Sequence, residues 1–336
     1  MAAPPNEDDP LAGLSAPMRR VFDEWRALGA RPVETLALAE ARAQPDLLEA
    51  ARSLVGKQER PPPPSRVNVT RTDLSYTGPG GAQLLRIFKP DTAPSAAGVT
   101  LYLHGGGWVL GSVERYESSA LALARKSGAI VAAAAYRQAP EHRFPAAHED
   151  AWAAWRWLMA NAASFGGDPR KLAVAGECSG GNLAAHVALR ARNEGLQKPL
   201  HQVLIYPIAG TDMNNYSYNT YGNALPFSKA RLQWLFRQIA TTPQALTDKR
   251  LVLGNNELRD LPRTTVITAE IDPVMFEGKL YGHKLEADNI PTRYQNFEGV
   301  LHDFFGMDAL LPEARKAQDT AAEQLEAAFR NAGREG

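Results

Sequence analysis

From Val99 onward, short apolar segments alternate with longer segments of helical spacing, and this alternation restricts the fold of the chain more than any other feature. Strands are predicted at 99–103, 129–136, 171–175, 202–206, 264–269 and 292–297. Helices are predicted at 116–127, 146–163, 180–193, 273–288 and 312–331. Strands and helices that alternate in this way form a mainly parallel sheet with helices on both faces. The sequence therefore predicts an α/β fold.

Two regions depart from the alternation. Residues 1–60 are predicted to be a helical N-terminal region, because apolar residues such as Met18, Val21 and Phe22 recur at helical spacing. A run of prolines, Pro61–Pro64, ends this region, and two strands of a hairpin follow at 67–76 and 84–88. Residues 208–261 interrupt the later alternation with a long polar and aromatic segment and one helix near 228–240. Long excursions of this kind are typical of lids, so we expect both regions to cover the site.

The overall composition excludes several classes of protein. The chain has 37 Lys and Arg and 37 Asp and Glu, so it lacks the basic surplus of a nucleic-acid-binding protein. It has one cysteine, so an intrachain disulfide is impossible. The first ten residues are acidic and proline-rich, unlike a signal peptide, and no apolar run could span a bilayer. We therefore expect a cytoplasmic protein with neither nucleic-acid nor membrane partners.

The sequence Gly176-Glu-Cys-Ser-Gly-Gly-Asn182 has the pattern of a nucleophile elbow, Gly-x-Ser-x-Gly, with Cys178 in the place of the serine. A predicted strand precedes it and a predicted helix follows it, as this motif requires. Gly176 and Gly180 would leave room for the tight reversal of the chain. Cys178 would then project from the carboxyl edge of the sheet, and it is the candidate nucleophile.

A second glycine run, His104-Gly-Gly-Gly-Trp108, directly follows the strand predicted at 99–103. Three glycines leave their amide groups uncovered, which favours an oxyanion hole. A phosphate-binding loop is less consistent with the run, because no Gly-Lys-Ser/Thr follows. Upstream of an elbow, the run indicates acyl transfer.

The elbow and the glycine run resemble motifs of the bacterial hormone-sensitive-lipase-like esterases, which have the α/β-hydrolase fold. Three further segments extend the resemblance: Tyr136-Arg-Gln-Ala-Pro-Glu-His142, Thr268-Ala-Glu-Ile-Asp-Pro273 and Leu301-His-Asp-Phe-Phe-Gly-Met307. The resemblance extends from about Val67 to the end of the chain and implies a hydrolase domain at 61–207 and 262–336. It implies a cap made by the N-terminal region and the 208–261 insertion. Two residues depart from the family pattern: Cys178 at the nucleophile, and Asp303 where a glycine usually follows the histidine.

The resemblance also implies the site residues. Asp272 would be the acid and His302 the base of a triad with Cys178, and their chain order agrees with that of α/β-hydrolases. The oxyanion donors would be the amides of Gly106, Gly107 and Ser179. Residues expected to contact the substrate are Trp108, Tyr206, Tyr216 and Phe227. No metal site is expected, because the histidines lack ligand spacing, and no cofactor is expected.

The predicted function is hydrolysis of short- or medium-chain carboxylic esters through a covalent acyl-enzyme. The surroundings of Cys178 favour a replaced catalytic serine, which would weaken or trap the enzyme. A natural thiol hydrolase or acyltransferase, as in the dienelactone hydrolases of this fold, and an amidase remain alternatives. A non-catalytic small-ligand receptor is an alternative of another class, and a homodimer is an open expectation.

Overall fold

The computed structural model describes residues 9–58 and 66–332. Within them, eight strands form one sheet in the order β1-β2-β4-β3-β5-β6-β7-β8. The two contacts that β2 makes, with β1 and with β4, are antiparallel, and all later pairs are parallel. This arrangement is an α/β-hydrolase fold and confirms the predicted fold class.

The strands agree with the predicted positions and differ mainly at their ends. The antiparallel edge consists of β1 (Val69–Gly78) and β2 (Gly81–Pro90), joined by the tight turn that the glycines predicted. The remaining strands are β3 (Ala97–Leu103), β4 (Ile130–Ala134), β5 (Gly167–Glu177), β6 (His201–Ile205), β7 (Arg263–Ile271) and β8 (Thr292–Leu301). Every residue of β3, β4 and β6 is buried, which agrees with the mainly apolar sequences of these strands.

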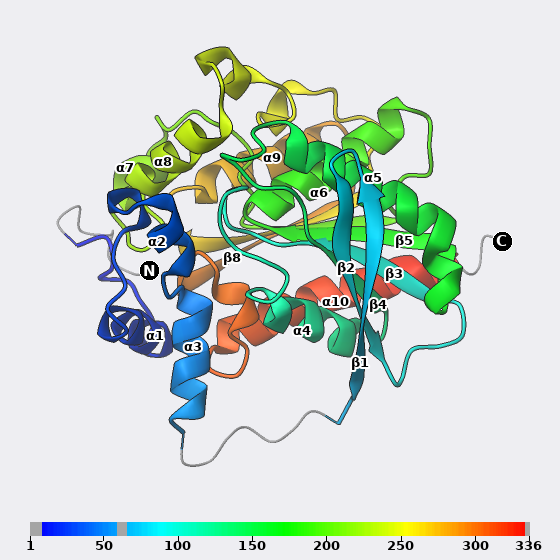
Figure 1. Cartoon of the computed structure of the whole chain (residues 1–336), viewed down its shortest axis with the longest axis horizontal. Helices are drawn as coiled ribbons and strands as arrows, with labels where there is room; N and C mark the ends of the chain where they lie inside the picture. Colours follow the sequence, from blue (N-terminus) through cyan, green and yellow to red (C-terminus); the bar gives the residue numbers. More distant parts are fainter. Residues whose placement is uncertain (1–8, 59–65, 333–336) are drawn as a thin grey trace.

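Five helices cover the sheet (Figure 1). On one face lie α5 (Ala146–Asn161), α6 (Ser179–Asn193) and α9 (Met275–Ala287), and on the other lie α4 (Glu117–Ser127) and α10 (Pro312–Ala332). A 3₁₀ turn at Ala162–Phe165 follows α5, and another at Phe304–Gly306 precedes α10. The two helical layers bury the parallel strands between them, as the alternation of strands and helices in the sequence predicted.

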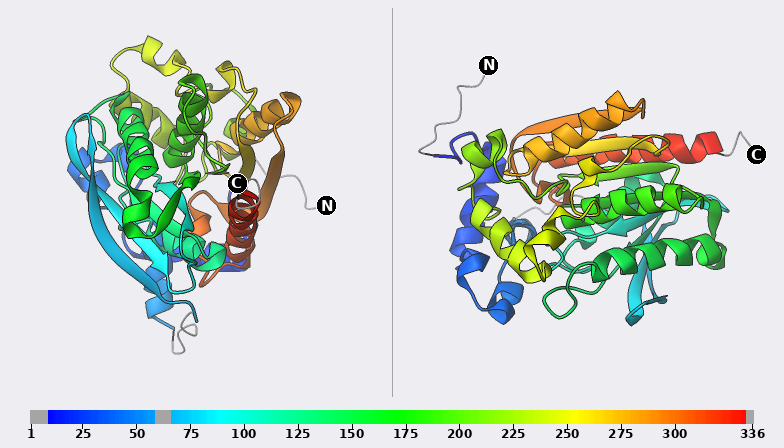
Figure 2. Two further views of the ribbon diagram at one scale, coloured as in Figure 1. Left: turned by 90° about the vertical axis from the view of Figure 1, so that its right-hand side faces the viewer. Right: turned by 90° about the horizontal axis from the view of Figure 1, so that it is seen from above.

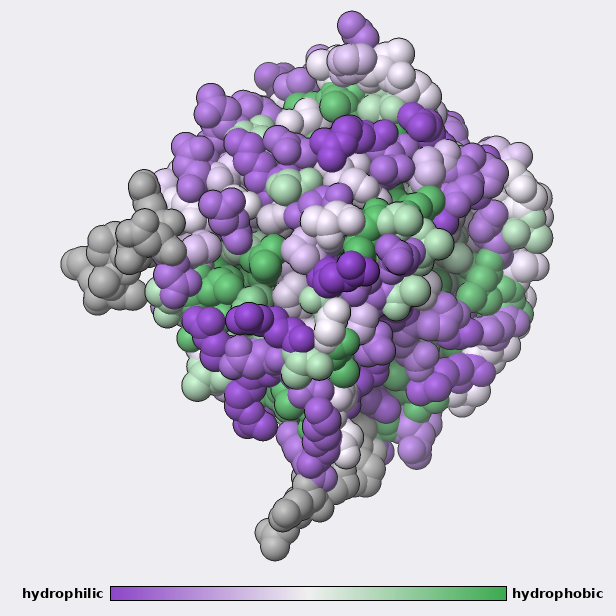
Figure 3. All heavy atoms as spheres, turned by 60° about the vertical axis from the view of Figure 1, so that its left-hand side comes forward, coloured by the Kyte–Doolittle hydropathy of each residue, from purple (hydrophilic) through white to green (hydrophobic). Residues whose placement is uncertain are grey.

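The remaining helices gather at one end of the sheet, although they come from distant parts of the sequence (Figures 1 and 2). They are α1 (Ala16–Ala27), α2 (Leu38–Ala43) and α3 (Leu47–Gly56) from the N-terminal region, and α7 (Tyr216–Tyr221) and α8 (Lys229–Ile239) from the insertion. Short 3₁₀ turns lie at Val33–Thr35, Pro243–Thr247 and Leu253–Asn255. The surface on this side is mostly hydrophilic, with small hydrophobic patches between the polar residues (Figure 3).

Two sequence expectations need comment here. The insertion contains α7 in addition to the predicted helix, because Asn215 caps this short polar and aromatic segment through bonds to the amides of Ser217 and Tyr218. The proline break at 61–64 lies outside the described residues. Among the described helices, none combines the length and apolar character needed to cross a bilayer.

Candidate active site

The elbow joins β5 to α6, and Cys178 is the N-cap residue of α6. Its backbone has φ 56° and ψ −119°, so this non-glycine residue lies in the left-handed half of the conformational map. A Cβ on Gly176 would lie 2.1 Å from the carbonyl oxygen of Gly180, and one on Gly180 would lie 2.0 Å from that of Leu103. Only glycines therefore allow the turn to close against the end of β3.

The two partners predicted for Cys178 come from the last two strands. Asp272 directly follows β7 and His302 directly follows β8, so all three residues lie at carboxyl ends of strands in the same sheet. The Nδ1 of His302 lies 2.6 Å from Oδ2 of Asp272. Another oxygen, Oδ1 of Asp272, accepts a bond of 3.0 Å from the amide of Val274, which fixes the carboxylate.

The opposite nitrogen of the histidine is unoccupied. Within the described residues, Nε2 of His302 is buried and has no hydrogen-bond partner. Burial alone would lower the pKa of His302, but its electrostatic and hydrogen-bond interactions with Asp272 and Cys178 outweigh burial and raise the pKa well above the ordinary value of 6.5. The three side chains are at most 1% exposed. This arrangement can hold a proton on His302 and stabilise the resulting cation through Asp272.

The glycine run after β3 turns beside the elbow. Gly106 has φ 108° and Gly107 has φ 63°, and a Cβ on Gly106 would lie 2.0 Å from the carbonyl oxygen of Leu110. In the part of the chain that is described, the N–H groups of Gly106, Gly107 and Ser179 donate to no other protein group. Three unpaired donors next to a nucleophile are the arrangement that an oxyanion requires.

The hydroxyl of Ser179 has a structural contact of its own. Its Oγ accepts a bond of 3.3 Å from the amide of Trp108 and so connects the elbow to the glycine run. This contact gives the hydroxyl of Ser179 a structural role between the two motifs, which agrees with Cys178 in the nucleophile position.

The residues expected to contact substrate occupy different places. The ring of Phe227 stacks on His302 with centroids 3.7 Å apart and planes inclined by 5°. Trp108 is buried with φ 61°, in the glycine run itself. Tyr206 lies with its ring centroid 4.5 Å from that of His302. Tyr216 is not brought to the triad: it is 56% exposed at the start of α7.

Glu177 anchors the elbow. Its carboxylate is fully buried and accepts hydrogen bonds from the hydroxyls of Tyr102 and Tyr206. Burial raises the pKa of Glu177 to about 7, although hydrogen bonds from Ser119 and the two tyrosines act in the opposite direction. The hydroxyl of Tyr206 therefore belongs to this network, and no motif in the sequence indicated the contribution of Tyr102.

Asp303, the second departure from the family pattern, has φ 68°. Glycine is favoured in this region, but Asp tolerates it better than most residues. Its Oδ1 accepts a bond of 2.8 Å from the hydroxyl of Tyr116. That hydroxyl would lie 2.6 Å from a Cβ on Gly105, so the Tyr116–Asp303 pair supports the glycine run from behind. Sequence reasoning missed Tyr116, since it lies outside every motif.

Three buried histidines, His104, His148 and His186, pack against other aromatic rings. The ring of His104 stacks on that of Tyr136 at 4.3 Å, and the ring of His148 packs edge-on against that of His186 at 5.2 Å. Burial lowers the pKa of both His104 and His148 to about 4, so they are neutral near pH 7. Within residues 9–58 and 66–332, no group of three or more His, Cys, Asp or Glu side chains could hold a metal ion.

Comparison with known proteins identifies relatives over most of the chain. Residues 100–306 match the model of a family with the α/β-hydrolase fold. An ethyl acetate hydrolase from Pseudomonas putida is 35% identical over 301 residues, which are 88% of this chain and 92% of that protein. The carboxylesterase NlhH from Mycobacterium tuberculosis is 32% identical over 277 residues, 81% of this chain and 86% of its own.

Two solved structures that resemble this chain are also ester hydrolases. An esterase from Pyrobaculum calidifontis is 33% identical, with a TM-score of 0.81 over 94% of this chain and 98% of that one. An ester hydrolase from the metagenome of Lake Arreo is 33% identical, with a TM-score of 0.83 over 94% of this chain and 99% of that one. With the sheet order and the family match, these likenesses show that the chain belongs to the α/β-hydrolase family, as a hydrolase of the carboxylesterase type.

Proposed function

We propose that this protein hydrolyses short- or medium-chain carboxylic esters through Cys178, His302 and Asp272, as a member of the hormone-sensitive-lipase-like group. The observation that carries the proposal is the 2.6 Å contact between Asp272 and His302, with the second histidine nitrogen unpaired in the described structure. The activity of the Pseudomonas putida relative, named an ethyl acetate hydrolase, supports small acyl and alcohol groups.

In the proposed reaction, His302 takes the proton of the nucleophile as it attacks the ester carbonyl. The amides of Gly106, Gly107 and Ser179 receive the negative charge on the carbonyl oxygen, and each such donor is typically worth about 10²- to 10³-fold in rate. His302 then donates its proton to the departing alcohol. Water, deprotonated by the same histidine, attacks the acyl-enzyme. The bond between the acyl carbon and the nucleophile then breaks, the acid is released, and His302 returns the proton to the nucleophile.

With Cys178, the intermediate is a thioester. Sulfur is larger than oxygen, and a displacement of ~1 Å at the reacting carbon can cost on the order of 10²-fold in rate. The tight backbone contacts at Gly176 and Gly180 leave the elbow little freedom to adjust. These contacts support the view that Cys178 replaces a catalytic serine and weakens or traps the enzyme.

We further propose that residues 1–60 and 208–261 act as a cap over this site. Two observations support this role for the insertion: Phe227 covers a face of His302, and a Cβ on Gly107 would lie 2.4 Å from Leu235 in α8. For the N-terminal region, Arg42 donates to the backbone carbonyl of Val109, next to the glycine run. Because the triad is buried, substrate entry requires these elements to move. Homodimer formation and a cytoplasmic location stay predictions.

The test compares the present chain with Cys178→Ser on short 4-nitrophenyl esters, with intact mass spectra of both. A fast serine form and a slow or acylated cysteine form are the expected results. A faster cysteine form would favour a natural thiol hydrolase. If neither form turned over or became acylated on esters, while the serine form cleaved amides, an amidase would replace the proposal. A receptor would give binding without turnover in both forms.

A further inference from the structure

A small cavity of about 40 Å³ lies between the N-terminal region and the glycine run. Residues of three origins line it: those of the hydrolase domain, those of the loop before α3, and those of α8 and the loop preceding it. They include Gly106, Tyr116, Asp303, Asp46, Pro226 and Arg231. The cavity therefore adjoins the glycine run on the side supported by Tyr116 and Asp303, and it adjoins the proposed cap on the other side.

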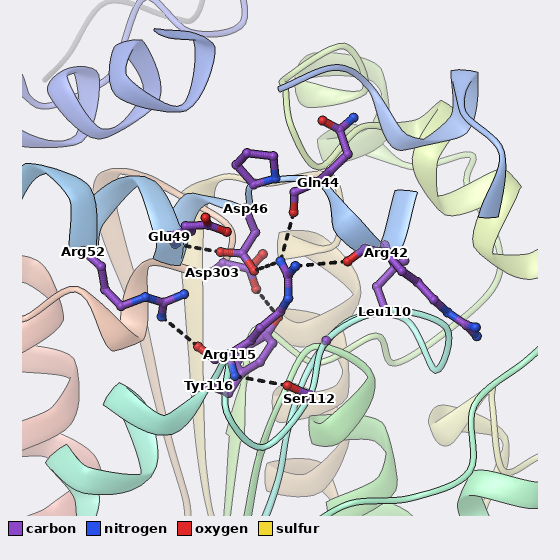
Figure 4. A network of polar contacts seen from close by, with 12 residues as sticks. Arg42, Gln44, Asp46, Glu49, Arg52, Leu110, Ser112, Arg115, Tyr116 and Asp303 are labelled. Carbon is purple, nitrogen blue, oxygen red and sulfur yellow. Dashed lines mark hydrogen bonds and ion pairs between the residues drawn. The ribbon is translucent and has the colours of Figure 1, made fainter. Parts of the chain in front are cut away.

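Two of the arginines that line this cavity, Arg42 and Arg115, form ion pairs with carboxylates, and the pair of Arg115 with Asp46 is drawn in Figure 4. The guanidinium of Arg115 lies 2.8 Å from Oδ2 of Asp46 and also donates to the backbone carbonyls of Gln44 and Arg42. Arg42 forms two bonds of 2.6 and 2.7 Å with Glu141. These pairs hold α2 and α3 against the hydrolase domain, and their cations are not available to a ligand.

Arg231 differs from these arginines. It is 8% exposed, and its guanidinium makes one hydrogen bond, from Nη1 to the carbonyl of Pro226 at 3.3 Å. Its Nε is buried without a partner, and no carboxylate of the described residues lies within 4.0 Å of its guanidinium nitrogens. Glu34 accepts a bond from Ser228 at the cap of α8, and its Oε2 is buried without a partner in the described structure, but it forms no ion pair with Arg231 within 4.0 Å.

The position of Arg231 in α8 makes this burial less favourable still. The residue lies in the first turn of the helix, where the macrodipole is positive and repels a cation. Burying a charge without a counter-ion costs several kcal/mol in proteins generally. A cation in such a place is explained if a bound molecule supplies the anion.

Arg231 is also connected to the triad. Its guanidinium lies over the ring of Phe227, 5.3 Å from the centroid, and the same ring stacks on His302 at 3.7 Å. One aromatic ring thus separates the unpaired cation from the candidate base. A substrate group that reaches past the ring of Phe227 from His302 would therefore meet the guanidinium of Arg231.

We propose that the substrate is an ester that carries a free carboxylate, and that Arg231 binds this carboxylate. The inference rests on the proposed esterase function. A guanidinium presents parallel N–H donors that match a planar carboxylate. A carboxylate is smaller than a phosphate and suits the small volume of the cavity better.

The experiment uses Cys178→Ser, for turnover, and two matched substrates: the mono-4-nitrophenyl ester of glutaric acid and its neutral methyl ester analogue, with the enzyme-free rates subtracted. A second pair, 4-carboxyphenyl and 4-carbamoylphenyl butyrate, places the carboxylate on the alcohol side. We expect kcat/KM to favour the anionic member of one pair, and Arg231→Gln to reduce that preference on the order of 10- to 100-fold.

Arg237→Gln is the matched control, because Arg237 is an exposed arginine on the same helix and should leave the preference unchanged. In case Arg231→Gln fails to fold, the serine form with Arg231 intact gives a second readout. Glutarate should inhibit its hydrolysis of a neutral ester more strongly than glutaramide does. Neutral-ester turnover with no carboxylate preference in either pair, and no inhibition by glutarate, would overturn this inference and leave the esterase function intact. Absence of any ester turnover would overturn both.

Discussion

The buried carboxyl group beside the nucleophile position makes the stability of this protein depend on pH in a way that one substitution can isolate. Burial raises the pKa of Glu177 from 4.5 to about 7 in the folded chain. Below the unfolded pKa, the group is protonated in both states, and its stabilising contribution is complete. As pH rises above 4.5, the unfolded chain releases its proton while the folded chain keeps it, so the contribution falls, and it is lost once pH passes about 7, where the folded chain ionises as well.

The size of the effect follows from the shift. A shift from 4.5 to about 7 corresponds to about 3 kcal/mol, because one pKa unit is worth about 1.4 kcal/mol. In Glu177→Gln the group cannot ionise. The free energy of unfolding of the parent should therefore decline by about 3 kcal/mol relative to that of the variant between about pH 4 and about pH 8.

Urea unfolding of both chains across this range measures the difference, and the contributions of other titrating groups cancel in it. Glu326→Gln, at an exposed position on α10, controls for the removal of one carboxylate. A difference that stayed constant with pH would refute the reasoning. It would mean that the hydroxyls of Tyr102 and Tyr206 stabilise the anion as strongly as burial destabilises it.

Three further predictions concern the site itself. In the Cys178→Ser form, Asp272→Asn should lower kcat by about 10³- to 10⁴-fold. The acid limb of the pH–rate profile should also move to lower pH, because the charge of Asp272 that raises the pKa of His302 is gone. An acid limb that did not move would contradict this origin of the pKa shift. Gly176→Ala should destabilise the fold by about 1–3 kcal/mol or more, because the new Cβ meets the backbone at 2.1 Å. The control is Gly56→Ala, which should change the melting temperature little because nothing lies within 4 Å of its new Cβ. Equal melting temperatures of the two variants would argue against the close approach at Gly176. Phe227→Leu should speed alkylation of Cys178 by iodoacetamide, because a smaller side chain replaces the ring that covers the site. Cys178 is the only cysteine of the chain, so the alkylation reports on this site alone. An unchanged rate under native conditions would show that other residues control access to Cys178.

Sequence reasoning located the parallel sheet because its strands are buried on both faces and therefore read as apolar runs, as in Ile130–Ala134. It was less accurate where polar residues form regular structure. The strand β5 begins at Gly167 instead of Lys171, because Gly167 pairs with Ala97 of β3 across a register shift that the polar sequence of this segment does not indicate. The helix α7 was missed because its sequence is polar and aromatic throughout.

In the candidate site, too, the sequence predicted the residues that lie in local motifs and missed those that distant contacts bring in. Cys178, Asp272 and His302 lie in short motifs at strand ends, and local sequence is enough to place such residues together. The surrounding contacts are not local: Tyr116 reaches Asp303 across most of the chain, and Arg231 meets the cavity only after α8 packs over the glycine run. No spacing rule in the sequence encodes these distant contacts.

The positions of positive φ have a consequence for how this chain can change. Four of the non-glycine residues with positive φ are Trp108, Cys178, Tyr206 and Asp303, and all of them border the candidate site. Backbone strain of this kind typically costs about 1–3 kcal/mol at each residue. Relaxing it is therefore a ready route to a more stable protein, and a search for heat-resistant variants that ignored activity would be drawn to these positions and would dismantle the site first.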